Sequence, residues 1–174
     1  MLTLLRTLAK AITGKVDALE FALGIFFGVL LGLLPVGEVD PGTGLLGLNT
    51  LWLAVLFVFL VLKASIPMAV LTAALVKLLA ILFLDAAAFH FGQAALPDGL
   101  AVSLAGAVPG LQLHTFWGFG TAVLGLLLAV AFFVAVYPLM KKRLPLWRER
   151  FGKTRLAKAL GNFFVFKLIG RLIG

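Results

Sequence analysis

Four long runs of apolar residues constrain this chain more than any other feature. They cover residues 18–36, 45–62, 68–95 and 117–140. Each run approaches or exceeds the roughly 20 residues that a helix needs to cross a bilayer core about 30 Å thick. Hydrophobic residues make up 63% of the 174 residues, against roughly 45–50% in soluble domains. The sequence therefore predicts an all-α fold, a polytopic membrane helical bundle with about four transmembrane helices.

Polar sequence is too scarce for a separate soluble domain, which needs roughly 50 residues. We expect a membrane helical domain over residues 1–143, beginning with an interfacial helix, and a basic amphipathic tail over residues 144–174. Residues 1–15 alternate apolar and basic side chains without a small-residue cleavage site, so we expect them to remain on the mature protein. The chain contains no cysteine, so disulfides are excluded.

The placement of basic residues predicts the orientation of the chain, because lysine and arginine are retained on the cytoplasmic side. With four crossings, one side receives all the basic residues that flank the runs: Arg6, Lys10, Lys15, Lys63, Lys141, Lys142 and Arg143. The other side receives the acidic residues Glu38, Asp40 and Asp98. We expect a multi-pass protein with both termini in the cytoplasm. A re-entrant hairpin over residues 18–62 would give the same charge placement and stays open as an alternative.

The first apolar run carries glycine at every fourth position, at Gly24, Gly28 and Gly32. Lipid solvates leucine as well as a neighbouring helix does, so membrane helices associate where small residues let their backbones approach. The stripe predicts a close helix contact, with the second or fourth apolar run of the same chain as the expected partner. Homodimerisation and docking of a foreign transmembrane helix are the alternatives.

The first run, ALEFALGIFFGVLLGLLP, is followed by a short loop, an asparagine and a second apolar span. This pattern resembles an uncharacterised bacterial inner-membrane family of domain-of-unknown-function status, some of whose members are fused to glycosyltransferases. The segment FLDAAAFHFGQAAL is similar to the Asp-Pro-x-x-x-His-x-x-Gly segment of a stand-alone subgroup, with Asp85, His90 and Gly92 at the matching positions. Ala86 replaces the proline of that segment, and Trp117-Gly118 replaces a pair of asparagines.

The resemblance implies a location in the bacterial inner membrane. It also implies a partner, because the stand-alone subgroup tends to accompany a large envelope protein that resembles lipid-carrying bridge proteins. The function expected on this basis is that of a membrane subunit in lipid traffic.

Lys77 is the strongest chemical signal among the residues themselves. It lies about 18 Å along a helix that starts near Ser65, close to the middle of a bilayer, where a lysine costs at least roughly 2.5–3.5 kcal/mol unless it is paired or hydrated. Glu20, Glu38 and Asp40 are candidate partners, whereas Asp85 lies two turns away and about 80° around a regular helix. Lys77 is either neutralised by a carboxylate or lines a polar cavity for a phosphate headgroup or an ion.

Asp85 and His90 are separated by about 140° on a regular helix, so they do not share a metal ion. The chain contains no phosphate-binding loop and no nucleophile-base-acid set. We therefore expect no catalysis, no cofactor and no metal. His90 and His114 are expected to form hydrogen bonds at the membrane interface. The candidate polar or lipid path consists of Glu20, Lys77, Asp85 and His90.

The segment from residue 141 to 174 holds ten of the fifteen basic residues and a single acid, Glu149. Aromatic residues are interleaved with lysine and leucine, which is typical of helices that lie in a headgroup layer and not of nucleic-acid binding. Each basic residue adds about 1 kcal/mol near an anionic leaflet. The predicted membrane-surface residues are Lys141, Lys142, Arg143, Arg148, Arg150, Lys153, Arg155 and Lys158. Docking of a cytoplasmic partner by this segment is the alternative.

Two functions fit these observations. The first is a non-enzymatic membrane subunit that holds, or feeds lipid to, an envelope lipid-transfer protein through the glycine stripe. The second is an autonomous small transporter or lipid scramblase, acting as a homo-oligomer, with Lys77, Glu20 and Asp85 in a polar pathway. Both have membrane lipids with anionic headgroups as partners, and neither involves nucleic acid.

Overall fold

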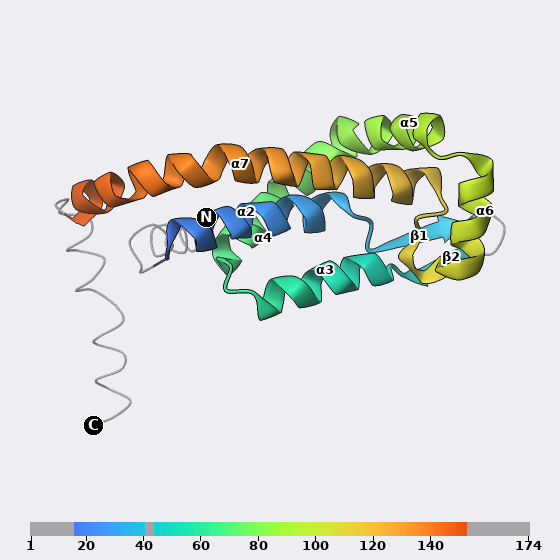
Figure 1. Ribbon diagram of the computed structural model, residues 1–174, viewed down its shortest axis with the longest axis horizontal. Helices are drawn as coiled ribbons and strands as arrows, with labels where there is room; N and C mark the ends of the chain where they lie inside the picture. Colours follow the sequence, from blue (N-terminus) through green and yellow to red (C-terminus); the bar gives the residue numbers. More distant parts are fainter. Residues whose placement is uncertain (1–15, 41–43, 153–174) are drawn as a thin grey trace, which may run out of the picture.

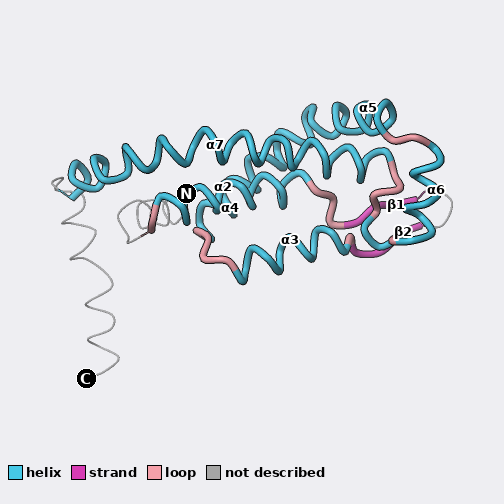
Figure 2. Tube along the Cα trace, viewed as in Figure 1, coloured by secondary structure: helices cyan, strands magenta, loops and turns pink. Residues whose placement is uncertain are grey.

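The computed structural model describes residues 16–40 and 44–152. These residues form a helical fold with one short β-hairpin (Figures 1 and 2). The elements, in chain order, are α2 (Ala18–Leu33), β1 (Gly37–Asp40), β2 (Gly44–Leu48), α3 (Thr50–Val61), α4 (Ile66–Leu79), the π-helix η1 (Ala80–Leu84), α5 (Asp85–Ala95), α6 (Asp98–Ala107), the 3-10 helix η2 (Pro109–Leu111) and α7 (Phe116–Gly152). The prediction of an all-α protein is confirmed, apart from the hairpin.

The chain runs back and forth along one long axis (Figure 1). Helix α2 packs against both α4 and α7, and α5 packs against α7. The hairpin and α6 lie together at one end of the bundle, and the start of α2, the end of α3 and the start of α4 lie toward the other (Figure 1). A backbone hydrogen bond from Ser65 N to Glu20 O, 2.9 Å long, joins the starts of α2 and α4. Helix α3 makes far fewer contacts than α2, α4 or α7.

A capping box begins helix α2. The Asp17 carboxylate accepts from backbone N–H groups of the first turn, and the Asp17 N–H in turn donates to Glu20 Oε2 over 3.3 Å. These bonds satisfy backbone donors that a helix start otherwise leaves free. The same acidic residues complement the positive end of the helix dipole.

The loop predicted over residues 37–44 is an antiparallel hairpin, and its second strand takes the first residues of the apolar run that was expected to be helical. Strands β1 and β2 pair Gly37 with Leu48 and Asp40 with Gly44. Gly47 has a positive φ of 89°, a value that glycine adopts more readily than other residues. This backbone conformation interrupts the second apolar run. Asn49 then caps α3, because its Oδ1 accepts from Leu51 N over 2.9 Å and from Trp52 N over 3.3 Å.

The third apolar run forms one continuous helical rod from Ile66 to Ala95, close to its predicted bounds. Pro67 fits in the first turn of α4, because the N–H group that proline lacks would have no acceptor within the helix at this position. The π-helix η1 interrupts the rod, which the apolar pattern did not predict. A turn of this kind holds an extra residue and rotates everything that follows it. The rod therefore packs against α2 over its first half and against α7 over its second.

Helix α7 is longer than predicted, running from Phe116 to Gly152 through Pro138 and Pro145. The expected boundary at residue 143 between the membrane domain and the tail thus lies inside a helix. The segment between the third and fourth apolar runs contains α6 and η2, and α6 buries none of its residues. Residues 1–15 and 153–174, where further interfacial helices were predicted, lie outside the described residues.

Within the described residues, two helices are long and apolar enough to cross a membrane, Ile66–Ala95 and Phe116–Leu146. Helices α2 and α3 have 16 and 12 residues. At 1.5 Å per residue they are about 24 Å and 18 Å long, shorter than a bilayer core of about 30 Å. Of the four predicted spans, two are therefore long enough as single helices to cross a bilayer core.

The glycine stripe lies against α4, which belongs to the third apolar run and not to the second or fourth as expected. A Cβ added to Gly24 would lie 2.6 Å from Ser65 O, one on Gly28 would lie 2.7 Å from Ala69 O, and one on Gly32 would lie 2.7 Å from Ala73 O. Because the nearest atoms are mostly backbone, the two helices are as close as glycine allows. The opposite side of α2 packs its larger side chains, including Val29 and Leu30, into a core shared with α7.

We predict that alanine has opposite effects at two helical glycines. At Gly28 the added methyl group would lie 2.6 Å from Thr72 Cβ, so overpacking should destabilise the fold by about 1–3 kcal/mol. At Gly106 on α6, no atom lies within 4 Å of the added Cβ. There the better helix propensity of alanine should stabilise the fold by roughly 0.5–1 kcal/mol. Thermal unfolding of Gly28→Ala and Gly106→Ala in one detergent tests this, and shifts of the same sign would contradict the close contact.

Candidate functional site

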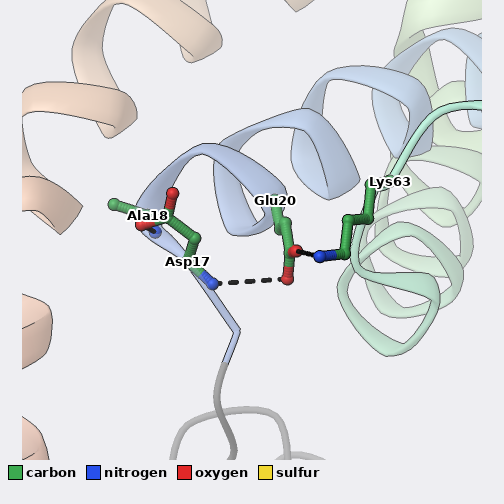
Figure 3. A network of polar contacts seen from close by, with 4 residues as sticks. All are labelled: Asp17, Ala18, Glu20 and Lys63. Carbon is green, nitrogen blue, oxygen red and sulfur yellow. Dashed lines mark hydrogen bonds and ion pairs between the residues drawn. The ribbon is translucent and has the colours of Figure 1, made fainter.

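The residues of the predicted polar path do not gather at one place. Glu20 lies at the start of α2, where its Oε1 forms an ion pair with Lys63 Nζ over 3.4 Å (Figure 3). The Lys63 side chain is 93% exposed, and exposed pairs of this kind contribute about 0–1 kcal/mol. Glu20 therefore belongs to the helix cap and to the link with the α3–α4 turn.

Glu20 is too distant to neutralise Lys77. Ser65 is fixed beside Glu20 by its backbone hydrogen bond, and Lys77 follows Ser65 by twelve residues on a helix. At 1.5 Å per residue, this places Lys77 about 18 Å further along the bundle. Among the described side chains, no carboxylate forms an ion pair with Lys77. The side chains of Glu38 and Asp40, the other predicted partners, lie outside the described part of the structure.

Lys77 is half-buried and lies level with the last turn of α2. A Cβ added to Gly32, in the last turn of α2, would lie 3.0 Å from the Cβ of Val76, the residue before Lys77. The last carbonyl groups of a helix carry partial negative charge and attract cations. Lys77 thus lies at the same level along the bundle as the negatively polarised C-terminal end of α2, a relation that the sequence did not indicate.

The π-helix changes the relation between Lys77 and Asp85. On a regular helix the two residues would differ by about 80°, but one extra residue in the intervening turn reduces this to roughly 20°. They consequently share a face of the rod, about two turns apart. Asp85 is half-buried, and its buried Oδ1 has no hydrogen-bond partner among the described residues. The expected separation of about 80° assumed a regular helix, which the π-helix interrupts.

His90 is exposed and packs edge-on against Phe89, with ring centroids 5.9 Å apart. It follows Asp85 along the regular helix α5, so the two side chains diverge as expected. Gly92, the third residue of the segment that resembles the stand-alone subgroup, has a packing role. A Cβ there would overlap the carbonyl group of Phe116, and one on Gly120 would overlap the carbonyl group of Ala88. These glycines create a second close helix contact, between α5 and α7.

Gln112 connects three elements at the hairpin end, and sequence reasoning missed it. Its side chain is 1% exposed, and its Nε2 donates to Gly47 O over 3.2 Å. Its backbone is left-handed, with a φ of 55° and a ψ of 22°, a conformation that is unfavourable for residues other than glycine. Its carbonyl accepts from Thr115 Oγ1 over 3.0 Å. The preceding Pro109-Gly110 is typical of a turn, but it does not indicate this connection.

Buried polar atoms without hydrogen-bond partners are concentrated around Gln112. Among the described side chains, six such atoms occur, and four lie in residues 49 and 112–117: Asn49 Nδ2, Gln112 Oε1, His114 Nδ1 and Trp117 Nε1. Buried polar groups in folded proteins are nearly always hydrogen-bonded. Four of the six atoms thus belong to residues that follow β2 or η2, at the hairpin end of the bundle.

The predicted membrane-surface residues divide into three groups. Lys141, Lys142 and Arg143 are exposed on α7. Arg148 and Arg150 lie on the last turns of α7, and their side chains are not described. Lys153, Arg155 and Lys158 lie outside the described residues. Across the described part of the chain, no group of three histidine, aspartate or glutamate residues could hold a metal ion.

We predict that glycine gives a more stable protein than alanine at position 112, the reverse of their usual order in a helix, because the backbone of Gln112 is left-handed. Gln112→Gly and Gln112→Ala both remove the amide, but alanine carries a penalty of about 1–2 kcal/mol in this conformation. Gln112→Gly should therefore unfold at the higher temperature. Gln93 is an exposed residue inside α5 and serves as the control, because there alanine should be more stable than glycine by about 1 kcal/mol. If alanine gave the higher melting temperature at both positions, the left-handed conformation assigned to Gln112 would be contradicted.

The chain was compared with protein-family models, with curated proteins and with solved structures. None of the three comparisons finds a match. The geometry of the described residues therefore provides the basis for a functional proposal.

Proposed function

We propose that the chain is a non-enzymatic, multi-pass integral membrane subunit that supports or feeds an envelope lipid-transfer partner. The apolar surface of the bundle is the observation that supports a location in the membrane. Large exposed apolar side chains occur on α3, on the α4–η1 rod and along α7, among them Phe57, Leu60, Val70, Leu82, Phe132 and Val134. Soluble monomers rarely expose contiguous apolar patches larger than a few hundred Å². A bilayer provides the solvent that such a surface requires.

Four passages through the membrane also fit the arrangement of the shorter elements. The 16 residues of α2 extend about 24 Å, and the four residues of β1 add about 13 Å at 3.3 Å per residue, together more than the bilayer core of about 30 Å. The hairpin would then emerge beside α6, opposite Lys63 and the basic end of α7. Pairing between β1 and β2 satisfies the inner edges of the two strands, and their outer edges have to lie in the headgroup region or against protein. In this proposal the basic end faces the cytoplasm of a bacterial inner membrane.

We predict that the two ends of the bundle are labelled from opposite sides. The chain contains no cysteine, so single cysteines report position without background. Ala64→Cys should react with a membrane-impermeant maleimide only from the cytoplasmic side, and Gly99→Cys and Glu38→Cys only from the periplasmic side. Gly99 has no atom within 4 Å of an added Cβ, so its substitution introduces no clash. Labelling of Glu38→Cys from the cytoplasmic side would establish the re-entrant alternative.

The partner contact requires a surface other than the glycine stripe, because α4 covers that stripe. Helix α3 provides one. It is apolar on all sides, and of its own residues only Phe59 is buried. A helix with apolar residues all round is normally covered by protein or lipid. The outward residues Phe57 and Leu60 are 67% and 65% exposed, and we propose α3 as the docking helix for the lipid-transfer partner.

An autonomous transporter or scramblase is the second candidate. The observation that favours it is the common face of Lys77 and Asp85, because charged residues inside a membrane often line a pathway. The interruption of the rod by η1 between them adds support, since π-bulges are frequent at functional sites.

We predict that the outer face of α3 is needed to retain the partner. The full chain, extracted in mild detergent, should co-purify with a large envelope protein. The double variant Phe57→Ala, Leu60→Ala should reduce the recovered partner about tenfold or more, which corresponds to at least about 1.4 kcal/mol. The matched variant Phe132→Ala, Leu139→Ala changes exposed residues on α7, 48% and 49% exposed, and should not.

Two outcomes would contradict the subunit proposal. One is a chain that purifies only with itself and moves phospholipid between leaflets of liposomes, which would establish the scramblase. The other is equal loss of partner in both double variants, which would remove α3 as the docking helix.

A further inference from the structure

The outer edge of strand β1 has no partner within the described part of the chain. Strands β1 and β2 form a sheet of two strands, so each strand has one paired edge and one outer edge. Among the described elements, only β2 packs extensively against β1. The outer edge of a strand presents unpaired backbone N–H and C=O groups, which can pair with another extended chain.

The backbone groups of Gly37 and Val39 form this outer edge. The hydrogen bond from Asn49 N to Val36 O, 2.8 Å long, shows that the Val36 carbonyl points toward the second strand. Across a trans peptide bond the next N–H points the opposite way, and along a strand the direction alternates with each residue. Glu38 therefore directs its N–H and C=O toward β2, whereas Gly37 and Val39 direct theirs outward.

A third strand would complete this sheet. An isolated hairpin of two strands is marginally stable in water, and three or more strands are usually needed. The proposed crossing also places β1 where the chain leaves the bilayer core, and unpaired backbone groups close to lipid are costly. A strand added to β1 would satisfy both the N–H and the C=O groups of the outer edge.

The charge of the hairpin end determines which kind of chain fits this edge. Two of the four residues of β1 are acidic, Glu38 and Asp40. Asp98 begins α6, which lies beside the hairpin at the same end of the bundle (Figure 1). Residues 16–62 and 78–140 contain no lysine or arginine. This end of the bundle is therefore acidic, and it attracts a basic chain.

The same charges oppose the other occupants of such an edge. Pairing with β1 of a second copy would bring the acidic residues of two strands together, and like charges across a strand pair are destabilising. Anionic lipid headgroups are repelled for the same reason. The exposed basic residues of α7, Lys141, Lys142 and Arg143, lie at the far end of the bundle (Figure 1). A basic segment from another protein is the occupant that the charges favour.

We propose that the outer edge of β1 binds an extended segment of a partner protein, rich in lysine or arginine, as a third strand of the sheet. The Val39 N–H donates to a carbonyl of this segment, and the Val39 C=O accepts from one of its N–H groups. Main-chain hydrogen bonds supply affinity in this mode of recognition, and the acidic residues select the charge of the segment. That the partner is the lipid-transfer protein rests on the function proposed above.

Binding of synthetic peptides to the purified full chain in detergent tests the edge without a second protein. The probe is a fluorescent hexapeptide that alternates lysine and valine, and its fluorescence anisotropy gives the dissociation constant. One control peptide alternates glutamate and valine. The other keeps the lysine–valine sequence but carries a methyl group on every backbone nitrogen, which removes its donors. Each control should bind about tenfold or more weakly than the probe.

Three outcomes of the peptide experiment would overturn the proposal. If the probe does not bind the wild-type chain, the edge takes no basic strand. Equal binding of the acidic control would remove the selection by charge. Equal binding of the methylated control would show attraction between charges without strand pairing.

Proline variants test which edge of β1 is used. Val39→Pro removes an outward N–H, and proline is tolerated on edge strands where its N–H would face away from the ladder. The hairpin should persist, while the dissociation constant of the probe should rise about tenfold, a change of about 1.4 kcal/mol. Glu38→Pro is the matched control, because it removes an inward N–H and should disrupt the hairpin itself. Wild-type affinity in Val39→Pro would overturn the assignment of the edge.

Hydrogen exchange of the wild-type chain gives a measurement that does not depend on the folding of a variant. Addition of the lysine–valine peptide should slow exchange of the Gly37 and Val39 amides and leave the amides of α3 unchanged. Exchange that slows only outside β1, or not at all, would contradict the added strand.

These measurements separate this inference from the proposed function. Peptide binding requires only the chain itself, whereas recovery of the envelope partner also depends on α3. Peptide binding without any co-purifying partner would contradict the subunit proposal and leave the edge in place. A partner that is retained by a chain unable to bind the peptide would contradict the edge and leave the subunit proposal in place.

Discussion

Backbone contact between α2 and α4 is the interaction on which the rest of the structure depends. Three glycines on α2 bring its backbone against the backbone atoms of Ser65, Ala69 and Ala73. In a bilayer, apolar burial provides little driving force between helices, so close packing of this kind has to supply it. The contact fixes α4 along one side of α2 and leaves the other side for α7, which shares Val29 and Leu30 as its core.

The π-helix allows one rod to serve two partners. Its first half follows α2, and its second half crosses α7 where Gly92 and Gly120 allow close approach. The rotation introduced by the extra residue changes which side chains share a face, and it places Lys77 and Asp85 on the same one. The same turn therefore determines both which helices the rod contacts and which of its charged residues share a face.

Helix α3 differs from the other long elements because few contacts hold it to the bundle. Those contacts are specific and polar at its start, where Asn49, Trp52 and the Gln112 connection fix it. Its apolar residues line an open groove with α2 and α7 on one side and face the surroundings on the other. The proposed partner would cover the outward face. The proposed function thus concerns the part of the chain that the fold itself leaves least covered.

The sequence by itself determined the all-α character, the extent of the rod from Ile66 to Ala95 and the presence of a close helix contact at the glycine stripe, because these depend on local composition and spacing. It did not determine that β2 and the Asn49 cap shorten the second run, because strand pairing involves residues on both sides of a turn. Only the tertiary structure decided that α4 covers the stripe, that Lys63 pairs with Glu20 and that Lys77 stands apart from both. It also revealed Gln112, whose hydrogen bond to Gly47 joins residues far apart in the chain. Contacts of this kind depend on how helices are placed in space, and the apolar pattern along each run carries no information about which helix lies beside it.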